Sequence, residues 1–166
     1  MDEGILLLRL ILAVLVAGHG AQKLVGWFGG GGIQGTTPLF ASWGLQPARL
    51  MVAIAGGLEV IGSALIATGT ATILGSCIVF GTMLVASAVT WKKGLWAAKG
   101  GYELPLVYGL VALAIGATGP GEYSVDHAVG LLNFSGINFA IGAAAIAALG
   151  AAPLLLRITR ATKTPS

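Results

Sequence analysis

Long runs of apolar residues constrain this chain more than any other feature. They cover residues 5–25, 48–68, 73–91, 103–118 and 137–156. Crossing ~30 Å of hydrocarbon takes roughly 20 helical residues, and four of the runs meet that need. We expect the shorter fourth run to start at Tyr102 or to include part of the preceding loop. The runs have no polar stripe, which indicates an all-α membrane protein with five transmembrane helices.

Composition agrees with this class. Charged residues make up 9% of the chain, whereas a soluble domain carries about a quarter. The net charge of +3 comes from few, scattered basic residues, which argues against nucleic-acid binding. Cys77 is the single cysteine, so no disulfide framework and no Cys/His zinc spacing is available. We expect no metal site and no cofactor held within the chain.

The positions of Lys and Arg predict the orientation, because basic residues collect on the cytoplasmic side. The N-terminus, the loop 68–72 and the loop 119–136 have no basic residue. The other loops and the C-terminus carry Lys23, Arg49, Lys92, Lys93, Lys99, Arg157, Arg160 and Lys163. With five spans, all of these residues fall on one side. The pattern therefore predicts the cytoplasmic membrane of the cell, with the N-terminus outside and the C-terminus inside.

Three ionisable residues share one face of the first span. At 100° per residue, Arg9, His19 and Lys23 fall within an arc of about 80°. Charges inside a span usually face a bundle interior or a wet cavity. The alternative is that Arg9 and Lys23 extend to opposite interfaces and that His19 is an ordinary core histidine.

Glu59 lies near the middle of the second span, where a lone carboxylate is costly. Counting rise along the helices puts it about 7 Å from the levels of both Arg9 and His19. An intramembrane Arg9–Glu59 ion pair is one interpretation, and a Glu59 that titrates beside His19 is the other. Tyr102 and Glu103, at the start of the fourth span, fall on the same membrane side as His19 and Lys23. Glu103 also suits a helix N-terminus. We therefore predict a polar pocket of His19, Lys23, Glu59, Tyr102 and Glu103.

The order of these motifs resembles the DoxX family over about residues 5–130. The matching stretches are His19-Gly20-x-x-Lys23, Gly26-Trp27-Phe28-Gly29-Gly30, Glu59, Gly101-Tyr102-Glu103 and Gly119-Pro120-Gly121-x-Tyr123-Ser124-x-Asp126. The resemblance implies a four-helix membrane domain in residues 1–130, with an interfacial segment at 26–47. It also implies that Tyr123 and Asp126 form an outer-loop motif. Residues 131–157 then add a fifth transmembrane helix, and 158–166 form a cytoplasmic tail. Within 26–47, residues 37–44 read as a short helix capped by Thr37.

The family resemblance also implies a link to quinone chemistry, and it leaves three functions open. The first is a quinone-linked redox subunit that works with a membrane or membrane-associated partner carrying the redox centre. The second is a non-catalytic accessory or scaffold subunit, in which the polar residues hold the bundle together. The third is a binder of a small lipophilic molecule. Whether the chain is itself an enzyme stays open.

Overall fold

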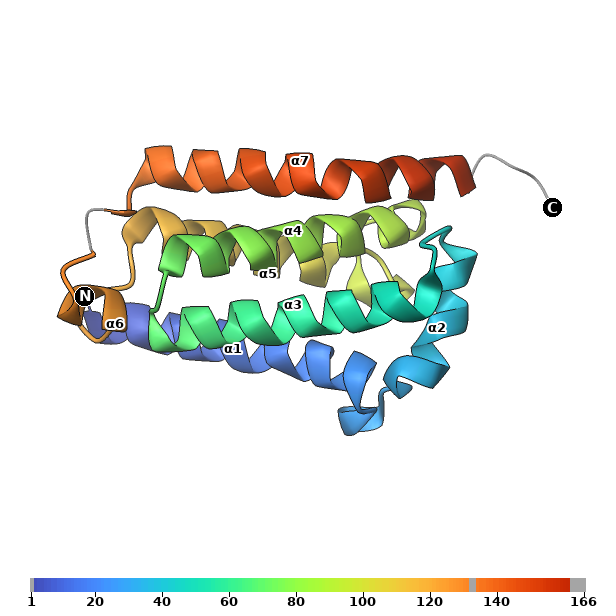
Figure 1. Cartoon of the computed structure of the whole chain (residues 1–166), viewed down its shortest axis with the longest axis horizontal. Helices are drawn as coiled ribbons and strands as arrows, with labels where there is room; N and C mark the ends of the chain where they lie inside the picture. Colours follow the sequence, from blue (N-terminus) through green and yellow to red (C-terminus); the bar gives the residue numbers. More distant parts are fainter. Residues whose placement is uncertain (1, 132–133, 162–166) are drawn as a thin grey trace.

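The computed structural model describes residues 2–131 and 134–161, and this part of the chain is helical with no β-strand. The long helices are α1 (Asp2–Leu24), α3 (Ala48–Thr68), α4 (Thr72–Thr90), α5 (Glu103–Thr118) and α7 (Ile137–Ala161). They run along the long axis of the molecule, with α4 and α5 between α7 and the α1–α3 pair (Figure 1). The N-terminus and α6 (Val125–Ala128) lie at one end, and α2 (Gly32–Ser42) lies at the other.

Four helices in the described residues are long and apolar enough to cross a membrane. They are Asp2–Leu24, Ala48–Thr68, Thr72–Lys93 and Ile137–Ala161. Helix α5 has 16 residues and falls short of that length. It does not start before Glu103, because Tyr102 is its N-cap and the residues before it form the short turns Trp91–Lys93 (η2) and Ala97–Lys99 (η3). The structure therefore supports a multi-pass helical membrane protein, and a fifth crossing stays a prediction.

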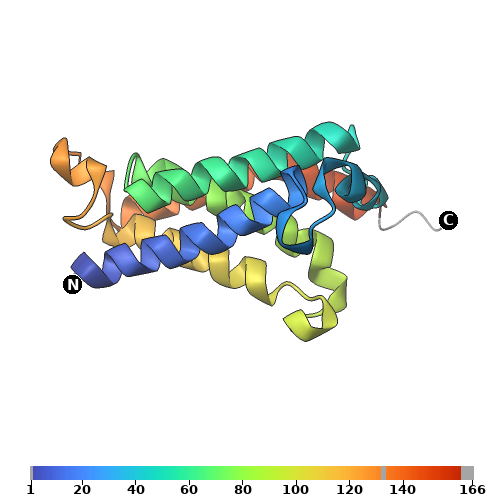
Figure 2. The same ribbon diagram turned by 90° about the horizontal axis from the view of Figure 1, so that it is seen from below.

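Small residues allow a close contact between α1 and α3. A Cβ on Gly20 would lie 2.9 Å from the Gly56 carbonyl oxygen, and one on Gly56 would lie 2.8 Å from Leu24 Cγ. Without a hydrophobic drive between helices in lipid, such close approach supplies the packing. Figure 2 shows α1 between α3 and α5, leaning toward α3 at its C-terminal end while α5 diverges.

The described residues form two apolar clusters inside the bundle. One joins α1, α3, α4 and α5 through Leu12, Val16, Ile66, Val79, Met83, Ala112 and Ile115. The other lies where α2 meets α3 and α7, and contains Phe40, Leu45, Ala48, Val52 and Ile158. Because Ile158 is buried there, α7 continues to Ala161, beyond the expected boundary at 157. The rest of the predicted tail, 162–166, lies outside the described residues.

The interfacial segment contains a longer helix than predicted. Helix α2 begins at Gly32, because the Gly31 carbonyl accepts the first helical bond, from Gly35 N, at 2.9 Å. Thr37 is therefore inside the helix, and its hydroxyl donates to the Ile33 carbonyl at 2.6 Å instead of capping. The predicted end is close to the observed one, since Gly44 adopts a left-handed conformation (φ +75°) just beyond Ser42.

Candidate functional site

Lys23 and Glu59 form a salt bridge that joins α1 to α3. Lys23 Nζ lies 2.7 Å from Glu59 Oε2 and 2.8 Å from Oε1. The Glu59 side chain is 3% exposed, whereas Lys23 is 23% exposed. Side chains of a helix tilt toward its N-terminus. Since α1 and α3 are antiparallel neighbours, Lys23 and Glu59 tilt toward each other. Glu59 is therefore paired, as its depth requires.

The predicted Arg9–Glu59 ion pair is wrong. The same tilt directs Arg9 away from Glu59, toward the end of the bundle where α3 finishes. There the buried guanidinium donates, at 2.6–2.8 Å, to the carbonyl oxygens of Ile66, Ala67, Pro120 and Tyr123. The last carbonyls of a helix have no partner within it and carry partial negative charge, so they suit a buried cation.

His19 links α1 to α5 without touching an acid. Its Nδ1 lies 3.0 Å from Gln22 Oε1, and the Gln22 amide nitrogen donates to the Phe28 carbonyl at 3.2 Å. Gln22 therefore presents its oxygen, and Nδ1 is the donor. In the neutral imidazole this leaves Nε2 as an acceptor. The His19 ring lies 5.8 Å from the Tyr108 ring, centroid to centroid. Neither Nε2 nor the Tyr108 hydroxyl has a hydrogen bond to another described residue.

A cavity of about 660 Å³ lies beside these groups. His19, Lys23, Glu59 and Tyr108 line it, together with mostly apolar residues of α2, α3, α4, α5 and α7. It lies toward the end at which α2 is found, since Thr36, Leu39 and Phe40 of α2 are among its lining residues. Several lining side chains are also exposed on the outer surface of the bundle, among them Leu39, Ile54, Leu104 and Ile146. The cavity is therefore partly open and not enclosed.

Tyr102 and Glu103 do not line this cavity. The Tyr102 ring stacks on Trp91, with centroids 4.5 Å apart and planes at 18°. Glu103 Oε2 accepts a bond from the Ala97 backbone N–H at 2.9 Å. Gly101 packs so closely against the carbonyl of Gly94 that a Cβ could not fit. The Gly-Tyr-Glu motif thus holds the loop before α5 in place, and that loop borders the cavity through Gly100 and Gly101.

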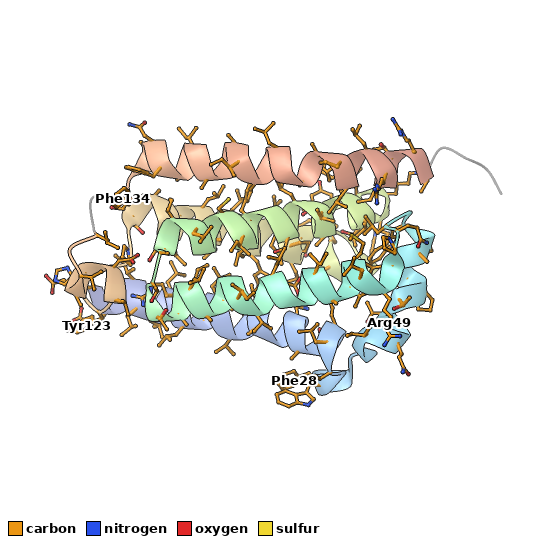
Figure 3. The ribbon with its side chains drawn as sticks, in the orientation of Figure 1. Phe28, Arg49, Tyr123 and Phe134 are labelled. Carbon is orange, nitrogen blue, oxygen red and sulfur yellow. The ribbon has the colours of Figure 1, made fainter. Side chains whose placement is uncertain are left out.

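The outer-loop residues act at the opposite end of the bundle. Asp126 is buried, and its carboxylate accepts from Ala71 N, Thr72 N and Thr72 Oγ1 at 2.7–2.8 Å. It thereby caps the N-terminus of α4 from a distant loop. Tyr123 contributes its backbone carbonyl to Arg9, while its side chain is exposed. Figure 3 shows Tyr123 and Arg49 toward opposite ends of the molecule.

Tyr108 is the site residue that the sequence reasoning missed. It lies in an apolar run, where one tyrosine is easily assigned to packing. One signal was available, since Tyr108 is the sole residue of the run 104–118 with an aromatic hydroxyl. Among the described residues, no group of three or more His, Cys, Asp or Glu side chains is placed to hold a metal ion.

Comparison with known proteins identifies the family. Neither the curated proteins nor the solved structures give a match to this chain. The sequence model of the DoxX family matches residues 4–91, which is more than half of the chain. This stretch runs from α1 to the end of α4 and includes His19, Lys23 and Glu59, while Tyr108 and α7 lie beyond it. The chain therefore belongs to the DoxX family of membrane proteins.

Proposed function

We propose that the cavity binds the oxygen-bearing ring of a quinone, and that the chain is a quinone-linked subunit of a membrane redox complex. The observation that carries this proposal is a partly open, mostly apolar cavity with a few polar groups on one wall. Its volume is in the range that ligand-binding pockets usually have, roughly 300–1,000 Å³. A lipophilic ligand with a polar head matches both parts of the lining.

The polar wall offers hydrogen bonds for both redox states of a quinone. A quinone carbonyl accepts, and the Tyr108 hydroxyl is a donor with no described partner. A quinol hydroxyl donates, and His19 Nε2 is an acceptor with no described partner. Lys23 is less available for a hydrogen bond to the ligand, because its ammonium already bonds both Glu59 oxygens. We therefore assign head-group contact to His19 and Tyr108, and a positioning role to Lys23 and Glu59.

Reduction of a quinone to a quinol takes two electrons and two protons. We assign the electrons to the redox centre of a partner protein in the membrane or at its surface. The side chains of the cavity wall would exchange the protons with the aqueous side. With five crossings and the N-terminus outside, that side is the cytoplasm, and the basic residues that flank the spans lie there too.

A second candidate is an accessory subunit that binds no ligand at this site. The observation in its favour is the Lys23–Glu59 salt bridge, which is complete by itself and ties α1 to α3. In that case His19 and Tyr108 would contribute only packing between α1 and α5. The two candidates differ in whether the cavity takes up a quinone.

Quinone binding to the purified protein separates them. We expect binding of a benzoquinone analogue, and a roughly tenfold weaker affinity in His19→Ala and in Tyr108→Phe, the effect of losing about 1.4 kcal/mol. His127→Ala is the matched control, because His127 is exposed at the opposite end of the bundle. An unchanged melting temperature would show that the fold is intact. Wild-type protein that does not bind, or equal affinities in all variants, would favour the accessory subunit.

A further inference from the structure

Helix α7 forms one wall of the cavity, although it lies outside the stretch matched by the family. The lining residues on α7 are Ile146, Ala147, Gly150, Ala151 and Leu154. Their spacing of one, four, five and eight residues places them on one face of the helix. Ala147 is buried against α4, and Ile146 is 66% exposed. This face therefore runs from the packed interior to the lipid-facing surface.

The rest of this part of the cavity is mostly apolar as well. Helix α3 lines it with Met51, Ile54 and Leu58, and α4 lines it with residues that include Gly81 and Val85. Leu58 directly precedes Glu59, so α3 borders the apolar part and the polar wall within one helical turn. The polar groups and the α7 face belong to the same cavity.

We infer that the α7 face receives the apolar tail of the ligand whose head group lies at His19 and Tyr108. This inference rests on the proposed function and extends it, since it specifies a long-chain quinone instead of a small, tailless one. Lipid is as apolar as the wall, so the wall does not draw the tail out of the bilayer. Its role is to leave a path along which the tail reaches lipid while the ring is seated. A side chain placed in that path should exclude tailed ligands and admit tailless ones.

Gly150 provides the test. It lines the cavity, and a Cβ built on it meets no atom within 4 Å. Gly142, on the same helix, has equally open space and does not line the cavity, so Gly142→Leu is the matched control for Gly150→Leu. Two probes share one dimethoxy-methyl benzoquinone ring, and one of them also carries a decyl tail. Quenching of tryptophan fluorescence reports binding, because Trp43 lines the cavity.

We expect Gly150→Leu to weaken binding of the decyl quinone at least about tenfold and to leave the affinity for the tailless quinone within about twofold. Gly142→Leu should leave both affinities unchanged. If Gly150→Leu weakens both quinones equally, or neither, the tail does not run along α7 and the inference is overturned. The proposed head-group site survives those results, because it is judged by His19→Ala and Tyr108→Phe.

Wild-type protein that binds neither quinone would overturn the proposed function. In that case a probe without a ring tests separately whether the α7 wall binds an apolar chain. Cys77 lines the same part of the cavity, and its alkylation by a maleimide reports occupancy. We expect decanol to slow this alkylation in wild-type protein and in Gly142→Leu, and to have no effect in Gly150→Leu. Equal alkylation rates with and without decanol in wild-type protein would overturn the wall as a site for an apolar chain.

Discussion

Lys23 and Glu59 form the charge pair that closes α1 onto α3, with the ammonium within 2.8 Å of both carboxylate oxygens. The pair is asymmetric, because Glu59 is 3% exposed and Lys23 is 23% exposed. A buried carboxylate without a partner is therefore costlier than the partly exposed ammonium without one. Gly20 and Gly56 bring the two backbones close at the same level of the bundle.

The asymmetry predicts unequal effects when either partner is neutralised. Removing one partner of a buried pair costs roughly 3–5 kcal/mol in soluble proteins. We expect Lys23→Met to fall in that range and Glu59→Gln to cost about half as much. The double variant should lose less stability than Lys23→Met alone, because no charge is left unpaired. Thermal unfolding in detergent measures this, and unchanged melting temperatures in both single variants would contradict it.

Arg9 and Glu59 should be energetically independent. Arg9 bonds two backbone carbonyls near the C-terminal end of α3 and two in the outer loop, so it shares no partner with Glu59. Substitutions at sites without shared partners usually add within about 0.5 kcal/mol. We expect the stability losses of Arg9→Gln and Glu59→Gln to sum to that of the double variant. A coupling above about 1 kcal/mol in the double-mutant cycle would restore the Arg9–Glu59 pair.

The sequence was sufficient for the helices and insufficient for the partners of the charged residues. Apolar runs located the long helices to within a few residues, because membrane-span length and composition are properties of the chain itself. The sequence offers Glu59 as one interpretation of the partner of Arg9, because a carboxylate is visible in a sequence. The true acceptors of Arg9 are backbone carbonyls, which every residue has, so no residue type marks them. Only the relative placement of α1, α3 and the outer loop shows which carbonyls converge.

The candidate pocket could be predicted only in part, because the sequence does not give the direction of every side chain. His19, Lys23 and Glu59 border the cavity because helix phase and depth, both readable from spacing, place them in the bundle interior. Tyr102 and Glu103 are on the expected end of the bundle, but they are engaged with Trp91 and Ala97. Membrane side alone cannot specify the direction of a side chain in a folded loop. The part of the cavity wall that α7 forms could not be predicted either, because it depends on how segments distant in the sequence pack together.

Asp126 should stabilise the start of α4 from across the outer loop. Its two oxygens accept from Ala71 N, Thr72 N and the Thr72 hydroxyl. Loss of an N-terminal cap typically costs about 1–2 kcal/mol, so we expect Asp126→Ala to destabilise by at least that amount. Asp2→Ala is the control, since its carboxylate accepts a hydrogen bond from Glu122 N in an exposed position. Equal melting temperatures for the two variants would show that the cap contributes no stability.

Gly18 and Gly20 should respond oppositely to the same substitution. A Cβ on Gly20 would lie 2.8 Å from Val60 Cγ2 and 2.9 Å from the Gly56 carbonyl oxygen, while one on Gly18 meets nothing within 4 Å. Alanine favours a helix over glycine by roughly 0.5–1 kcal/mol. We expect Gly18→Ala to raise the melting temperature slightly and Gly20→Ala to lower it, because backbone must move. Similar shifts for both would mean that α1 and α3 are not in close contact at Gly20.

The last prediction concerns the number of crossings. Helix α5 has 16 residues, short of the roughly 20 that a span usually needs, so its crossing must be tested separately. It packs beside α4 and runs along the bundle in the direction opposite to α1 (Figure 2). If it crosses, reporter fusions at residues 70, 97, 128 and 166 should read outside, inside, outside and inside. A fusion at 128 on the cytoplasmic side would mean that α5 does not cross. It would also contradict the position of Asp126 at the outer end of the bundle, the end at which Arg9 lies. Fusions at 70 and 97 serve as internal controls, because both precede α5 and keep their sides in either case.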